Sequence, residues 1–118
     1  MANMDLGVAE HLYKLYHPMP VEIICYHCQQ GAEKAIKALI TNLGLESGMP
    51  KVHDLSFLLN QIHKKIKIEE KYYDYADTLT PYGVAVRYPH QLELDEGNAA
   101  MAIKYAKEIV FWVKKTIG

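Results

Sequence analysis

The chain has 118 residues, and its 14 acidic and 13 basic side chains give a formal charge of −1. Half of the residues are apolar and 23% are charged, a composition that excludes disorder and predicts a single domain over residues 1–118. The small net charge argues against a free-standing, non-specific nucleic-acid binder, because such proteins carry a basic excess.

The first five residues, Met-Ala-Asn-Met-Asp, lack the basic and apolar regions of a secretory signal. No apolar run approaches the roughly 18 residues that a membrane span requires. We therefore expect a cytoplasmic protein with no membrane partner.

Every segment with a clear period has the helical one. The first helix is predicted over residues 3 to 16, where a proline-rich stretch ends it. Pro20 suits the first turn of a second helix over residues 20 to 43, and Gly44 suits its carboxyl-terminal cap. The apolar stripes are Leu6, Ala9, Tyr13 and Tyr16 in the first helix, and Cys28, Ala32, Ala35, Ile36, Leu39 and Leu43 in the second.

A third helix opens at His53-Asp54, where Asp54 can cap its amino terminus. A shorter helix is predicted near residues 69 to 79, followed by a loop over residues 81 to 93. The last helix runs from Asp95 to about residue 117. The expected fold is all-α, an up-and-down bundle of four main helices plus a short fifth. The later stripes are Leu55, Leu58, Leu59, Ile62 and Ile66; Tyr72, Tyr75, Ala76 and Leu79; and Ala99, Ile103, Ala106, Val110, Val113 and Ile117.

Cys25 and Cys28 form a Cys-x-x-Cys pair inside the predicted second helix. A zinc site needs two further ligands, and a redox pair belongs at a strand-to-helix junction. Buried cysteines behave as small apolar residues, so core packing is the favoured interpretation. The sequence predicts neither a metal nor a cofactor.

The second helix also carries an unusual polar segment. His27, Gln30 and Lys34 share one face of the helix. Gln29 and Glu33 are expected beside that face, opposite the apolar stripe, with Glu33 and Lys37 forming an i, i+4 ion pair. Gly31 indicates close approach by another helix or loop. This pattern suits either a polar cleft or a semi-polar dimer surface.

Arg87 is the only arginine in the chain. Its planar guanidinium suits bidentate binding of phosphate or carboxylate. Its neighbours are aromatic or titratable: Tyr82, Tyr88 and His90. From this segment alone a ligand or RNA role and a structural salt bridge, to Glu33 or Asp54, are equally open.

Four stretches in order resemble the HEPN domain family of prokaryotes. They are Asp5-Leu6 with Ala9; the run from Tyr26 to Leu39; His53-Asp54-Leu55 with Leu58-Leu59; and Leu79-Thr80-Pro81-Tyr82 leading to Arg87-Tyr88-Pro89. The resemblance covers essentially the whole chain. It implies an all-α bundle, a homodimer, and a minimal nucleotidyltransferase as partner in a two-gene module of the toxin–antitoxin type.

Many HEPN members are metal-independent ribonucleases, whose signature is an arginine followed by a histidine after four to six residues. Arg87 matches that arginine and begins the Arg-Tyr-Pro signature of the nucleotidyltransferase-associated branch. The histidine does not match, because His90 follows after only two residues and no histidine comes later. A ribonuclease needs its acid/base groups within hydrogen-bond reach, so this spacing argues against catalysis.

We therefore expect a nucleotide- or RNA-binding partner subunit of a nucleotidyltransferase, not itself catalytic. The residues expected to bind are Arg87, Tyr88, Tyr82, His27, Gln30 and Lys34, with Tyr82 or Tyr88 stacking on a base or holding the loop. One alternative is an endoribonuclease toxin that uses Arg87 with His90 or His27. Another is a purely structural dimerisation module, in which Arg87 fastens its loop to Glu33.

Overall fold

The computed structural model describes residues 2–15, 20–45, 54–84 and 94–118. Five α-helices and one 3₁₀ helix account for most of them, and these residues form no strand. The elements are α1 (Ala2–Leu15), α2 (Val21–Asn42), α3 (Leu55–His63), α4 (Glu70–Leu79), η1 (Thr80–Val84) and α5 (Glu96–Ile117). The predicted all-α bundle is confirmed.

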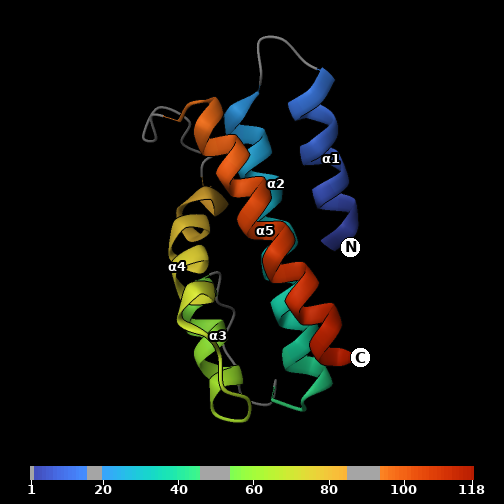
Figure 1. Cartoon of the computed structure of the whole chain (residues 1–118), viewed down its shortest axis with the longest axis vertical. Coiled ribbons are helices and arrows are strands. Elements are labelled where there is room, and N and C mark those ends of the chain that lie inside the picture. The colour runs from blue at the N-terminus through green and yellow to red at the C-terminus, as the bar shows by residue number, and fades with distance from the viewer. Residues whose placement is uncertain (1, 16–19, 46–53, 85–93) are drawn as a thin grey trace.

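The two longest helices, α2 and α5, form the centre of the bundle (Figure 1). Helix α1 packs on α2 and α5, while α3 and α4 follow one another along the other side of that central pair. No helix among the described residues is both long and apolar enough to cross a membrane.

Helix boundaries follow local sequence signals. Asp54 caps α3, its side chain accepting a hydrogen bond from the Phe57 backbone N–H at 3.2 Å, as predicted. Gly44 ends α2 in a left-handed conformation, φ +71°. The backbone N–H groups of Gly44 and Leu45 donate to the carbonyls of Thr41 and Ile40, the pattern of a Schellman cap.

Three details of the predicted helices were wrong. Pro20 precedes the first turn of α2, at the N-cap position, because the helix starts at Val21. Helix α3 stops at His63, three residues short of Ile66, and the His63 ring accepts a hydrogen bond from the Ile68 backbone N–H. The predicted loop after residue 80 begins instead as η1.

The core contains most of the predicted stripe residues, and Cys25 and Cys28 lie in it fully buried as free thiols. Their predicted core packing is therefore confirmed. In α5 the buried face is wider than the predicted stripe, because Ala102 and Ile109 are buried as well. The stripe residue Ile117, at the end of the helix, is 44% exposed. Tyr16 and His53 lie outside the described residues.

Candidate functional site

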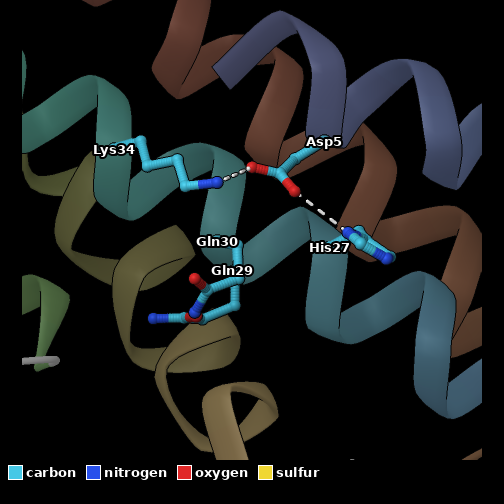
Figure 2. Close-up of polar contacts among 5 residues, drawn as sticks. All are labelled: Asp5, His27, Gln29, Gln30 and Lys34. Atoms are coloured by element: carbon cyan, nitrogen blue, oxygen red, sulfur yellow. Dashed lines mark hydrogen bonds and ion pairs between the residues drawn. The ribbon is translucent and has the colours of Figure 1, made fainter. Parts of the chain in front are cut away.

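The polar segment of α2 divides into two hydrogen-bonded clusters that project in different directions (Figure 2). In the first cluster, the Asp5 carboxylate of α1 binds two side chains of α2. Lys34 Nζ donates to Asp5 Oδ2 at 2.7 Å, and His27 Nδ1 donates to Asp5 Oδ1 at 3.0 Å. Two of the three residues predicted to line a binding face are thus held against α1.

Asp5 is only 7% exposed, so its charge depends on these partners. Burial alone would raise the pKa of Asp5, but the hydrogen bonds and positive charges of Lys34 and His27 outweigh burial and lower it. The carboxylate is consequently ionised at neutral pH. It neutralises Lys34, which weakens that lysine as an independent phosphate ligand.

The close contact between α1 and α2 explains Gly31. A Cβ atom at this position would lie 3.3 Å from the Ala2 carbonyl oxygen and 3.5 Å from Asp5 Cβ. The predicted close approach by another element is therefore confirmed, and the element is α1. The absence of a side chain at Gly31 brings the Asp5 carboxylate within reach of both His27 and Lys34.

The second cluster is a chain of side-chain hydrogen bonds along α2. Gln30 Nε2 donates to Gln29 Oε1 at 2.7 Å, and Gln29 Nε2 donates to Glu33 Oε1 at 2.8 Å. Lys37 Nζ donates to Glu33 Oε2 at 2.9 Å, which confirms the predicted ion pair. The amide of Gln30, the remaining member of the predicted face, thus belongs to this second cluster.

Gln29 and Glu33 were expected opposite the apolar stripe, yet both lie in the interior. Gln29 is fully buried and Glu33 is 5% exposed, although both are polar. The Gln29 side chain is buried because η1 packs against it. A Cβ atom on Gly83 would lie 3.1 to 3.3 Å from the Gln29 amide atoms. The 3₁₀ helix therefore rests on the second cluster, and a glycine allows that approach.

Tyr82, a predicted binding residue, is 6% exposed. Burial raises the pKa of Tyr82, and a side-chain hydrogen bond with Asn98 of α5 offsets part of that rise. A buried ring of this kind is inaccessible for stacking on a nucleobase. Its position favours the other role predicted for Tyr82, which is to hold this segment against the core.

A further contact fastens η1 to the start of α3. The Leu55 backbone N–H donates to Thr80 Oγ1 at 3.1 Å, and Thr80 Oγ1 donates to the Ala76 carbonyl at 2.8 Å. This places η1 beside Asp54, one of the two carboxylates proposed to pair with Arg87. Arg87, Tyr88 and His90 themselves lie outside the described residues.

Asp5 is the site residue that reasoning from patterns missed. An acidic residue in the first turn of a helix is ordinarily a solvated, dipole-stabilising group. The signal in the sequence was Gly31, since a mid-helix glycine predicts a close neighbour that could bring such a carboxylate to His27 and Lys34. Within the described ranges, no three His, Cys, Asp or Glu side chains gather in a way that could hold a metal ion.

Comparisons with known proteins fit this architecture. The HEPN domain model matches residues 1–116, so the chain belongs to the HEPN domain family. The crystal structure of ST0689, an archaeal HEPN homologue, is 27% identical, with 99% of this chain and 92% of that one covered and a TM-score of 0.77. TT1696 from Thermus thermophilus is 23% identical and shares the fold, with a TM-score of 0.79 over 97% of this chain and 91% of that one. No curated protein has a matching sequence.

Proposed function

We propose that this HEPN protein is a nucleotide- or RNA-binding partner subunit of a minimal nucleotidyltransferase, working as a homodimer and not itself catalytic. Membership of the HEPN family supports a nucleotide- or RNA-related role. In this proposal Arg87 binds phosphate, Tyr88 stacks on a base, and the second cluster of α2 supports the segment that carries both.

The observation that carries the proposal is the contact between Gln29 and Gly83. A fully buried glutamine amide, hydrogen-bonded on both sides, underlies the last turn of η1, from which the chain continues to Arg87. A buried, satisfied polar network of this kind fixes the position of what rests on it. Such a base suits a segment that has to present one guanidinium to a ligand.

The charge distribution on α2 favours Arg87 as the phosphate ligand. Lys34 is paired with Asp5, and Lys37 is paired with Glu33. Because each lysine has a carboxylate partner, this face of α2 offers little uncompensated positive charge. Arginine also forms the bidentate hydrogen bonds that phosphate oxygens accept best.

The test is binding of a fluorescein-labelled single-stranded RNA and of a fluorescent ATP analogue, measured by polarisation. Replacing Arg87 by Ala or Lys is expected to weaken binding about tenfold or more, the usual effect of losing a bidentate charged contact. The matched control is Lys64→Ala, which removes one exposed charge from the end of α3. If Lys64→Ala weakened ligand binding as much as the Arg87 variants do, the loss would reflect general electrostatics, which would contradict the proposal.

The same variants separate the two alternatives. Metal-independent RNA cleavage that persists in EDTA and disappears in Arg87→Ala and His90→Ala would establish the ribonuclease. The structural role has one observation in its favour: His27, Gln30 and Lys34 all bind other side chains of the chain. An Arg87→Ala variant that is several kcal/mol less stable, with no ligand bound by the wild type, would establish that role.

The partner is tested separately. A minimal nucleotidyltransferase encoded by the adjacent gene, co-eluting with this protein in size-exclusion chromatography, would support the two-gene module. Light scattering would measure whether this chain alone is a dimer. A stable monomer that binds no nucleotidyltransferase would contradict this part of the proposal.

A further inference from the structure

An open groove runs between α1 and α5, and at its end near the start of α1 it is also lined by Lys34, Ala35 and Ala38 of α2. The two helices are antiparallel, because Asn3 accepts a hydrogen bond from Lys114 at 2.8 Å and Glu10 pairs with Lys107 at 2.9 Å. Two adjoining hollows of about 400 and 370 Å³ share the residues Asn3, Val110 and Lys114. The groove is therefore continuous around the amino-terminal end of α1.

The walls of the groove are apolar and unusually exposed. Phe111, on its α5 side, is 68% exposed. Ile117, which lines the other hollow, is 44% exposed. A cluster of large exposed apolar side chains beside a hollow is typical of an interaction surface.

Gly7 opens the groove in the middle of α1. A Cβ atom built on this residue would meet no heavy atom within 4 Å, so the glycine is not needed for internal packing. A helix-interior glycine costs about 1 kcal/mol relative to alanine. Nothing within the described fold offsets that cost, which suits a position where an outside element packs closely.

The rim of the groove is positively charged. Lys104, Lys107, Phe111 and Lys114 follow one another at i, i+3, i+7 and i+10 on the exposed side of α5. Glu10, which also lines the groove, pairs with Lys107 at 2.9 Å and offsets the charge of that lysine. Lys104 and Lys14, which lies one turn beyond Glu10 on the facing stripe of α1, add positive charge at the same end. Lys114 contacts the Asn3 amide, which is neutral and leaves the lysine charge in place.

We propose that this groove binds an amphipathic helix with an apolar stripe and acidic flanks, supplied by a partner protein. A third helix laid between two antiparallel helices completes a small bundle and buries the apolar walls. Acidic flanks complement the lysine rim, which gives the site its selectivity. A second copy using the same face fits poorly, because an isologous contact would bring the lysines of the two copies together.

The probe is a fluorescein-labelled peptide of about 18 residues, five helical turns, with leucine at i, i+3, i+7 and i+10 and mostly glutamate elsewhere. A counterpart with lysine in place of glutamate has the same apolar stripe. Polarisation is expected to show the acidic peptide bound about tenfold or more tightly, with the difference reduced by salt. Equal binding of both peptides, or no binding of either, would overturn the proposal.

Two variants locate the site. Phe111→Ser removes the apolar wall, and Gly7→Glu introduces bulk and negative charge at a position with free space. Each variant is expected to weaken binding of the acidic peptide about tenfold. Phe57→Ser, at an exposed phenylalanine of α3, is the matched control and should bind like the wild type. Circular dichroism verifies that every variant is folded.

Three other occupants give distinct results, each of which overturns the proposal. A wild-type dimer that Phe111→Ser converts to monomers would assign the groove to a second copy. Competition between single-stranded RNA and the acidic peptide, together with loss of RNA binding in the double variant Lys107→Gln, Lys114→Gln, would assign the groove to nucleic acid. Sedimentation with anionic vesicles, lost in Phe111→Ser, would assign it to a lipid surface.

Discussion

The Asp5 carboxylate lies 2.7 Å from the Lys34 ammonium, although 29 residues separate them in the sequence. This contact joins the first helix to the second where they pack most closely against Gly31, which lies directly beside the Ala2 backbone. The ion pair therefore helps to align the two helices, in addition to neutralising the buried carboxylate.

Replacing Asp5 by Asn tests this contact. The amide keeps the size of the carboxylate but removes its charge, which leaves Lys34 without its partner and weakens the hydrogen bond from His27. We expect the free energy of unfolding to fall by about 1–3 kcal/mol, the range for losing a largely buried, charged hydrogen bond. Urea unfolding monitored by circular dichroism measures it. An unchanged midpoint would mean that the contact contributes nothing to stability.

The same pair predicts a dependence on pH. The pKa of Asp5 is lower in the folded chain than its ordinary value, so its contribution is complete above the unfolded-state pKa of about 3.9 and is lost as the pH falls through the lower, folded pKa. The stability difference between wild type and Asp5→Asn should be constant from about pH 6 to 5 and shrink below about pH 4. Other carboxylates cancel in this difference. A difference that grew on acidification would contradict the assigned direction.

Gly83→Ala tests the support beneath η1. The added methyl group would lie 3.1 to 3.3 Å from the Gln29 amide, which is fully buried and held by two hydrogen bonds. We expect a loss of about 1–3 kcal/mol, typical of overpacking a filled site. Gly7→Ala is the matched control. With free space around it, that change should stabilise the protein by about 0.5–1 kcal/mol.

The two cysteines should be unreactive in the native protein. Burial raises the pKa of Cys25 to about 12 and raises the pKa of Cys28 even further, so neither forms much thiolate at neutral pH. We expect a chromogenic disulfide reagent to label neither thiol rapidly at about pH 7.5, and to label both once urea unfolds the chain. Rapid labelling of the folded protein would show that this part of the core opens easily.

Local signals predicted the helices well because those signals act over a few residues. Asp54 as the cap of α3 and Gly44 as the end of α2 followed from side-chain and backbone preferences that the tertiary structure left intact. The width of a buried stripe was less predictable. Ala102 and Ile109 are buried because α5 has neighbours on several sides, which a single period does not reveal.

The candidate site was harder to predict because it depends on distant segments. Helical spacing grouped His27, Gln30 and Lys34 on one face, whereas the structure joins Gln30 to Gln29 in a separate cluster. It also placed Gln29 and Glu33 opposite the apolar stripe, and both are buried. The burial of Gln29 comes from the contact with η1, which has no sequence signal at α2 itself. The partner that holds His27 and Lys34 came from another helix, and only Gly31 indicated its approach.

The packing of α5 against α2 has a consequence for synthesis of the chain. Helix α2 is complete by Asn42, but much of its buried face is covered by residues 96–117, which leave the ribosome well after it. Until then that apolar surface is exposed, and a nascent chain in this state is prone to aggregate. Chaperone protection of the unfinished chain therefore matters for this protein more than for one whose early helices cover each other completely.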